Sequence, residues 1–223
     1  MGYTLPVSEA VHPPKQQRSR EALARLLEAT VAIVRTDGLV GATIPRIAAA
    51  AKMAPASVYR RFRDKESLLR TAFIDVLERS NAVNTAAIPP MLEDRTLEWV
   101  AGALARSLIQ QYRLQPTFMR AMIRFVENDD DEQFRRRAME LVTTNAQFVV
   151  DEIISRFSHR IVHADPKRAV TFITLVLANV VETRVLEAFS LWTEMLPISD
   201  DELVAELKHL FLAFLTTRID AGR

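Results

Sequence analysis

The chain has 223 residues, of which 49% are apolar, and its formal net charge at pH 7 is +1. A chain of this length can bury a substantial core in one or two domains. Because the sequence contains no cysteine, a disulfide framework and a thiolate metal site are excluded. Glycine is scarce, with five residues, and long stretches lack the alternation of a strand, so the sequence predicts an all-α protein.

Charge is distributed unevenly along the chain. Residues 15–65 hold eleven Lys or Arg and four Asp or Glu, a net charge of +7, whereas the rest of the chain holds 18 and 24, a net charge of −6. A basic amino-terminal quarter on an otherwise acidic protein is typical of a DNA-binding domain. A charge run taken alone is more often a solvated surface, so this interpretation depends on the motif in the same region.

Residues 1–14 lack periodicity and end in two prolines, which predicts a flexible amino-terminal arm. The arm is polar and rich in proline, unlike a secretory signal peptide. The longest apolar run, Phe172–Val181, is interrupted by Thr174 and Asn179 and is too short to span a bilayer. We therefore expect a cytoplasmic protein that does not enter a membrane.

Residues 15–65 predict three helices with clear boundaries. The first ends at Asp37-Gly38, because glycine suits the carboxyl terminus of a helix. Thr43 can cap the second helix and Pro55 opens the third, since proline is tolerated in a first turn. Asp64 caps a fourth helix, and Pro89-Pro90 are expected to break the chain after it.

The second and third helices read as a compact helix-turn-helix. One buried stripe recurs at i, i+3, i+4 and i+7, and two apolar residues of the third helix can close on it: Ile44, Ile47, Ala48, Ala51, Val58 and Phe62. The outward positions carry cations, a hydroxyl and a phenol: Ser57, Tyr59, Arg60, Arg61, Arg63 and Lys65. A recognition helix with such side chains suits a DNA major groove.

The same residues form a family pattern, Thr-x-x-x-Ile-Ala followed after a turn by Tyr-x-x-Phe-x-x-Lys-Glu-x-Leu. It reads here as Thr43, Ile47, Ala48, Tyr59, Phe62, Lys65, Glu66 and Leu68. This pattern resembles the tetracycline-repressor (TetR) family, over about residues 18–77. Members usually have glycine in the turn and in the recognition helix, where this chain has Lys52 and Ala56. Lys52 is therefore expected near positive φ, a costly conformation for a residue other than glycine.

The helix signals and the resemblance imply the same architecture of nine helices. A DNA-binding head spans residues 15–65, a fourth helix (about 65–85) connects, and residues 86–223 form a ligand-binding and dimerisation body. The body helices are expected at about residues 92–112, 116–128, 131–157, 165–192 and 200–219. Caps at Asp165 and Ser199 mark the last two.

The resemblance also implies roles for residues in the head. Thr43, Tyr59 and Lys65 would hold DNA phosphates, with Arg46 as a further candidate. Base edges would be read by Lys52, Ser57 and Arg60, since an arginine forked onto guanine discriminates by about 1–3 kcal/mol. The alternative for each residue is an ordinary exposed polar group. A single head reads few base pairs, so two recognition helices about 34 Å apart on a palindrome are expected.

The two helices nearest the carboxyl terminus are the most apolar of the chain. A helix that is apolar nearly all round is buried on both sides, which favours a four-helix dimer interface, and the family uses the same helices. The predicted homodimer contacts are Val181, Val185, Phe189, Trp192, Leu207, Leu210, Phe211 and Phe214. The alternative is a purely intramolecular core.

A small-molecule pocket is expected in the body. Polar residues stand on apolar stripes, and burying such groups costs roughly 1–3 kcal/mol unless a partner is present. Together with aromatic and methionine side chains at helical spacing, the candidates are Trp99, Tyr112, Phe118, Met122, Phe125, Asn145, Phe148, Glu152 and Asn179. Each of these could instead be plain core. An unknown ligand that is small and largely hydrophobic fits this set.

The sequence thus predicts a ligand-responsive repressor that binds a palindromic operator as a dimer. The alternative is a DNA-binding regulator without a small-molecule inducer, controlled by a protein partner or acting as an activator. An enzyme is not expected, because nucleotide-binding and nucleophile motifs are lacking. His159 and His163 could ligate a metal on a continuous helix, but they fall where the seventh helix should end. Glu206 with His209 is interpreted as a surface pair, so neither a cofactor nor a metal is expected.

Overall fold

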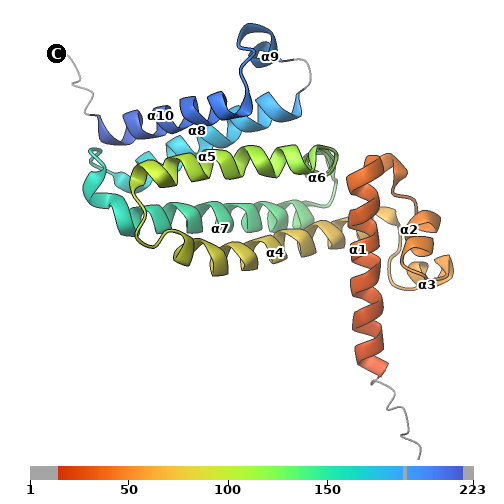
Figure 1. Cartoon of the computed structure of the whole chain (residues 1–223). Coiled ribbons are helices and arrows are strands. Elements are labelled where there is room, and N and C mark those ends of the chain that lie inside the picture. Colours follow the sequence, from red (N-terminus) through yellow and green to blue (C-terminus); the bar gives the residue numbers. More distant parts are fainter. Residues whose placement is uncertain (1–14, 188–189, 218–223) are drawn as a thin grey trace, which may run out of the picture.

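The computed structural model describes residues 15–187 and 190–217, which contain ten α-helices, one 3-10 turn and no strand (Figure 1). The predicted all-α class is confirmed. The helices are α1 (Lys15–Gly41), α2 (Ile44–Ala50), α3 (Pro55–Tyr59), α4 (Lys65–Met91), α5 (Leu97–Leu114), α6 (Pro116–Asn128), α7 (Glu132–Phe157), α8 (Pro166–Leu186), α9 (Leu191–Met195) and α10 (Asp200–Thr216), with the 3-10 turn at Ser158–Arg160.

Helices α1 to α3 form the head, and local signals explain their boundaries. Gly38 has φ 65° and interrupts α1 where a helix end was predicted, although helical hydrogen bonding resumes as far as Gly41. Lys52, in the turn between α2 and α3, has φ 55°, so it takes the left-handed conformation that family members usually give to glycine. The core of the head is the predicted stripe, including Ile47 and Val58, which are fully buried.

Helix α4 leaves the head and runs along the whole body. Asp64 accepts a hydrogen bond from the Ser67 N–H, and Ser67 reciprocates, so this capping box fixes the start of α4. The predicted end near residue 85 is wrong, because Pro89 and Pro90 lie inside the last turn. The φ of proline is compatible with a helix, and the two prolines only remove two backbone N–H donors. Helical hydrogen bonding resumes after them, from the Leu92 N–H to the Ile88 carbonyl.

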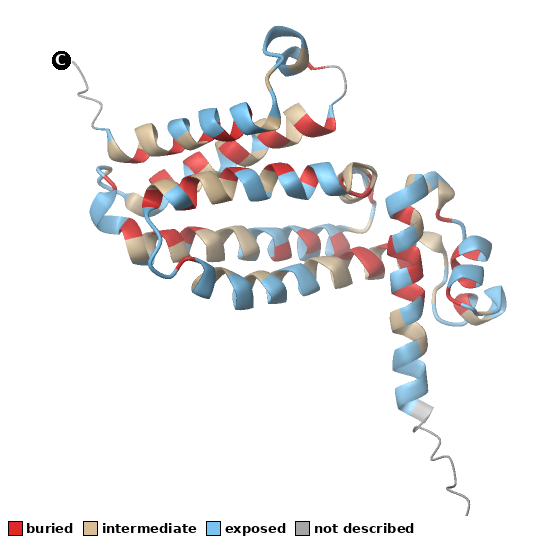
Figure 2. Cartoon of the chain, viewed as in Figure 1, coloured by how far each residue is buried: buried red, intermediate tan, exposed pale blue. Residues whose placement is uncertain are grey.

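The body is a bundle in which α4 packs on α7, α7 on α8, and α5 on both α8 and α10. These helices lie nearly side by side, while α1 crosses the end of the bundle (Figure 1). Buried residues face inward along each helix (Figure 2). Side-chain caps at Thr96, Asp131, Asp165 and Ser199 start α5, α7, α8 and α10.

The region after α8 departs from the nine-helix prediction. The expected helix over 165–192 is divided, because α8 ends at Leu186 and Ser190 caps the separate short helix α9. This division gives the tenth helix. By length and composition α8 is apolar enough to cross a membrane, but it packs against α5, α7 and α10 as a core helix of the bundle.

Candidate DNA-binding surface and ligand cavity

The predicted DNA-contacting residues all belong to the segment from Thr43 to Lys65 of the head. They come from the amino end of α2, the following turn, α3 and the first residue of α4. Tyr59 is 58% exposed although it is a large aromatic residue, and Thr43, Lys52 and Arg60 are exposed as well. Ser57 and Lys65 are half-buried. The buried side of α3 is held by Val58, which leaves its other faces to solvent.

Two of the predicted base readers contact each other. The Arg60 Nη2 donates to the Ser57 Oγ at 2.8 Å, so the guanidinium lies along the outside of α3. Lys52 lies in the turn that precedes α3 and is exposed. A hydroxyl and two cations on one short helix and its turn can donate to base edges or phosphates, which are acceptors.

Some cations of the head are engaged within the protein. Arg46 forms an ion pair with Asp37 and donates from Nη1 to the Gly41 carbonyl at 3.0 Å. Arg61 donates to the Ser19 Oγ at 3.2 Å, which ties α3 to α1. The Lys65 Nζ is 3.8 Å from the Glu66 carboxylate. Arg46 would therefore have to exchange a partner to contact a phosphate, whereas Tyr59 would not.

The head joins the body through α1, α4 and α6. Phe73 of α4 contacts Phe118 and Phe125 of α6 in edge-to-face pairs, with ring centroids 5.8 and 5.3 Å apart. Arg70 of α4 donates from Nε to both carboxylate oxygens of Asp129, at 2.9 and 3.0 Å. Asp129 lies just after α6 and its side chain is 3% exposed. A ring cluster and a buried ion pair therefore fix the start of α4 against the body.

An elongated cavity of about 310 Å³ lies between α4, α5 and α7. Most of its wall is apolar, and the described residues that line it include no charged side chain. They are Asn84, Ala87, Ile88, Met91, Leu92, Val100, Ala103, Leu104, Ser107, Leu108, Gln111, Asn145, Val149 and Ile153. Ala87, Ser107 and Gln111 are exposed, so the cavity opens to solvent between α4 and α5. Its size and composition suit a small organic molecule.

Of the nine residues predicted for a pocket, Asn145 lines this cavity. The Tyr112 hydroxyl instead donates to the Glu182 carboxylate at 3.2 Å, and burial raises the pKa of Tyr112 above its usual value. Phe118 and Phe125 belong to the ring cluster at the joint. The remaining positions lie elsewhere: Trp99 beneath the Arg95 guanidinium, Glu152 in an ion pair with Arg156, Met122 and Phe148 half-buried, and Asn179 exposed.

The sequence interpretation missed the contribution of α4 to the cavity. Ala87, Ile88 and Met91 come from the part of α4 beyond the predicted end near residue 85, whereas Asn84 lies within the predicted helix but was not selected. The available signal was the apolar face that Ile88 and Met91 continue beyond residue 85.

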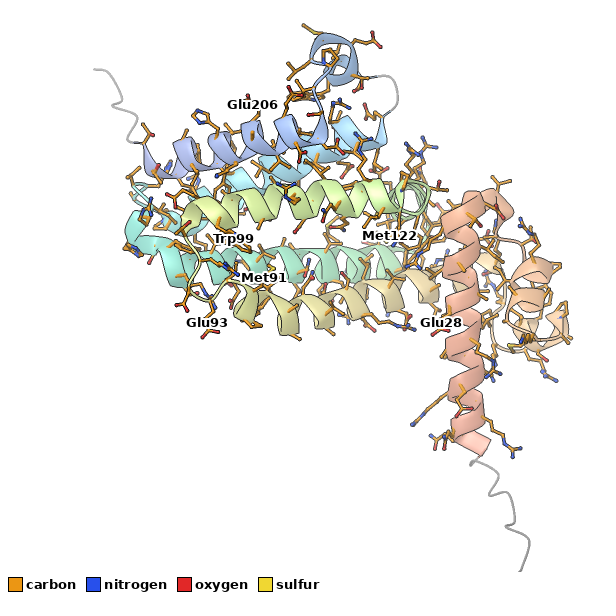
Figure 3. The ribbon with its side chains drawn as sticks, in the orientation of Figure 1. Glu28, Met91, Glu93, Trp99, Met122 and Glu206 are labelled. Atoms are coloured by element: carbon orange, nitrogen blue, oxygen red, sulfur yellow. The ribbon has the colours of Figure 1, made fainter. Side chains whose placement is uncertain are left out.

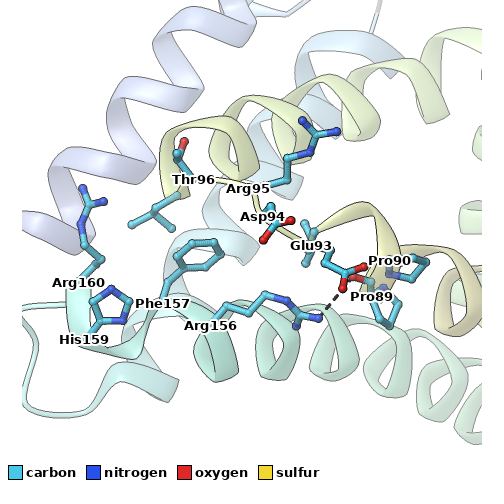
Figure 4. A pocket seen from close by; sticks show the side chains of 12 residues that line it. Pro89, Pro90, Glu93, Asp94, Arg95, Thr96, Arg156, Phe157, His159 and Arg160 are labelled. Atoms are coloured by element: carbon cyan, nitrogen blue, oxygen red, sulfur yellow. Dashed lines mark hydrogen bonds between the residues drawn. The ribbon is translucent and has the colours of Figure 1, made fainter.

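A wider cleft of about 770 Å³ lies at the far end of the bundle, around Pro89, Glu93, Arg156 and Arg160 (Figure 4). Arg156 donates to the Pro89 carbonyl at 3.4 Å and pairs with Glu152, and Arg160 pairs with Glu98 at 2.7 Å. Because charged side chains line much of the cleft and the cleft opens to solvent, it has the character of a solvated polar surface rather than of an apolar ligand site.

The predicted dimer contacts fall into two groups. Val181, Val185, Leu207 and Phe211 are buried within the chain itself. Trp192 and Leu210 are exposed, Phe214 is half-buried, and Phe189 lies outside the described residues. The structure adds exposed apolar residues that the sequence interpretation did not select, Phe172 and Leu175 on α8, which are 55% and 58% exposed.

The histidines near the end of α7 do not share a continuous helix. His159 lies in the 3-10 turn, while the His163 ring contacts the Phe214 carbonyl at 2.6 Å from the loop before α8. Within residues 15–187 and 190–217, no three His, Asp or Glu side chains are grouped as metal ligands.

A helix-turn-helix head on a helical body with a cavity defines a DNA-binding regulator. Residues 26–72 match the family model "Bacterial regulatory proteins, tetR family". The amino-terminal domain therefore carries the DNA-binding motif of the TetR family, as the sequence predicted. No curated protein matches the chain as a whole.

Solved structures show the same fold over most of the chain. A putative TetR-family transcriptional regulator from Mesorhizobium loti MAFF303099 is 20% identical, with 88% of this chain and 96% of that chain covered and a TM-score of 0.67. FadR from Bacillus subtilis in complex with stearoyl-CoA is 14% identical (86% and 98% covered, TM-score 0.60). Multidrug binding protein EbrR complexed with imidazole is 15% identical (90% and 98% covered, TM-score 0.56).

Proposed function

We propose that the protein is a cytoplasmic repressor that binds a palindromic operator as a homodimer and is released by a small, largely apolar molecule. The observation that carries this proposal is the course of α4. This helix starts at Lys65, directly after the recognition helix, and its last two turns line the cavity of the body. One rigid element therefore connects a DNA-contacting surface with a ligand-sized space.

The DNA contacts that we propose are the exposed residues of the head. Tyr59 and Lys65 hold the backbone on either side of a phosphate, with Thr43 at the start of α2. Lys52, Ser57 and Arg60 face the base edges from α3 and its turn. Arg46 contributes after it leaves Asp37. The excess of positive charge in residues 15–65 supplies the sequence-independent attraction.

We propose that dimerisation uses the outer face of α8 and α10. Phe172 and Leu175 on α8 and Leu210 on α10 expose apolar side chains that a monomer would leave in water. Contiguous apolar surface of this kind is typical of a subunit interface. A two-fold axis through these helices would present both heads to one face of the DNA.

Release follows if the ligand favours a different position of α4. Occupying the cavity pushes α4 relative to α5 and α7, and this movement changes the spacing of the two heads. A coupling of about 1–3 kcal/mol loosens DNA binding about 5- to 150-fold. Two similar structures, FadR in complex with stearoyl-CoA and EbrR complexed with imidazole, support a ligand in this fold.

Fluorescence anisotropy on DNA from upstream of the protein's own gene tests the proposal. We expect tight, sequence-dependent binding that a hydrophobic small molecule weakens. A variant that fills the cavity, Ala103→Phe, should bind the same DNA normally and lose the response. A response that survives in Ala103→Phe would place the ligand elsewhere, and equal binding to a scrambled duplex would exclude autoregulation.

A further inference from the structure

The cavity has a polar end and an apolar end. Helices α4 and α7 run in the same direction, because the Asn84 Nδ2 donates to the Asn145 Oδ1 at 2.9 Å and Arg156 reaches Pro89 further along. Helix α5 runs back over them (Figure 1). Going away from the head, the wall therefore changes from Asn84, Asn145, Ser107 and Gln111 to Ile88, Met91, Leu92, Val100 and Ile153. Met91 marks the apolar end (Figure 3).

The polar end carries amides and a hydroxyl but no charge among its described residues. Ser107 and Gln111 are exposed, so an ionised group at this end would keep part of its water, but the water that it loses is not replaced by an opposite charge, which is costly. A hydroxyl or carbonyl would meet donors and acceptors of suitable strength. From Asn84 at the polar end to Met91 at the apolar end, the cavity follows about 10 Å of α4, at 1.5 Å per residue, which accommodates a short hydrocarbon chain.

The amide pair at the polar end also links two helices. The bond between Asn84 and Asn145 joins α4 to α7 at the wall of the cavity, and both side chains are half-buried. A ligand hydroxyl placed there competes for the same donor and acceptor. The contact that recognises the ligand is then also a contact that holds α4 in place.

We propose that the cavity selects an uncharged amphiphile, with its hydroxyl or carbonyl on Asn84 and Asn145 and its hydrocarbon chain directed away from the head. The amide pair is the sensing contact, because the ligand replaces it. This inference rests on the proposed ligand-responsive function and specifies the class and the orientation of the ligand.

Calorimetric titration with three probes tests the ligand class: 1-octanol, octanoate and octylammonium share a chain and differ in the charge of the head. At neutral pH we expect 1-octanol to bind at least about tenfold more tightly than either ion. Equal or tighter binding of an ion, or binding of none of the three, would overturn the proposed class. DNA binding by the ligand-free protein is a separate readout, and its failure would instead overturn the proposed function.

Variants of Asn145 test the sensing contact. Asn145→Leu should weaken 1-octanol about 3- to 10-fold, the effect of one hydrogen bond. The matched control is Asn81→Leu, which removes another bond between α4 and α7, from the Asn81 Nδ2 to the Leu141 carbonyl at 2.9 Å, outside the cavity wall. It should leave 1-octanol binding unchanged.

Asn145→Asp keeps the acceptor for Asn84 and places a carboxylate at the polar end. It should shift the preference toward octylammonium, a gain that a misfolded variant cannot show. If Asn145→Asp and Asn145→Leu both bind the three probes as the wild type does, Asn145 is not the contact for the polar group and the inference fails.

Discussion

Replacing Arg70 by methionine removes the guanidinium that pairs with Asp129 at the joint between head and body. The Asp129 side chain is 3% exposed and that of Arg70 is 25% exposed, so the variant leaves a buried carboxylate without its cation. Breaking a buried pair in this way costs about 3–5 kcal/mol. Asp129 keeps the Asp131 N–H as a donor, at 2.8 Å, which places the expected loss of unfolding free energy near the lower value, about 3 kcal/mol.

The control is the double variant Arg70→Met, Asp129→Asn, which removes the stranded charge. We expect it to recover about 2 kcal/mol relative to Arg70→Met alone. Urea unfolding at one fixed protomer concentration measures all members of the cycle, since the stability of a dimer depends on concentration. A coupling energy below about 0.5 kcal/mol would equal that of an exposed pair and would refute the role assigned to this contact.

Three further predictions concern the head and the dimer. Lys52→Gly should raise the urea concentration at the midpoint of unfolding, because glycine relieves the strain of the left-handed backbone. The same variant should weaken DNA binding in anisotropy. A rise in both stability and DNA affinity, or a fall in both, would contradict this prediction. Hydrogen bonds from Ser67 lower the pKa of Asp64 below 3.8, so the stabilisation that its carboxylate gives is complete above that pH and is lost as the pH falls through the folded pKa. Asp64→Asn should therefore reduce the fall of the unfolding temperature at acid pH in a pH series of thermal unfolding. An unchanged fall would exclude the Asp64 cap as its source. Leu175→Glu should convert dimers to monomers in sedimentation, with the far-UV circular dichroism unchanged. If the variant remains a stable dimer, the interface does not include Leu175.

The head was predictable from sequence because its boundaries depend on local signals. Gly38 and Pro55 act through their backbone preferences and Asp64 through its side-chain oxygen, within a few residues of where they stand. Thr43 occupies the predicted cap position of α2 in an extended conformation but makes no side-chain cap hydrogen bond. The unusual conformation of Lys52 followed from the family pattern in the same way.

Most of the cavity's lining could not be predicted, because it depends on how far apart α4, α5 and α7 pack. A stripe of apolar residues looks the same in sequence whether it faces a neighbouring helix or an empty space. Pro89-Pro90 also misled the interpretation: each lacks the N–H that would bond to the preceding turn, but the helix still continues to Met91 and the Leu92 N–H bonds to the Ile88 carbonyl. Similarly, α8 is apolar nearly all round, so its sequence did not reveal which residues face the core. In the structure Val181 is buried and Leu175 is exposed.

The salt dependence of DNA binding tests the central claim, that the head holds the DNA backbone through Lys65. Wild type, Lys65→Ala and a body control, Lys167→Ala, whose cation pairs with Asp151, would be compared by anisotropy at several salt concentrations. We expect Lys65→Ala to reduce the slope of log affinity against log salt by about 1 for each head, or about 2 for a dimer, on every DNA sequence, while the control keeps the wild-type slope. An unchanged slope in Lys65→Ala, or the same reduction in Lys167→Ala, would contradict the assignment of this surface to DNA.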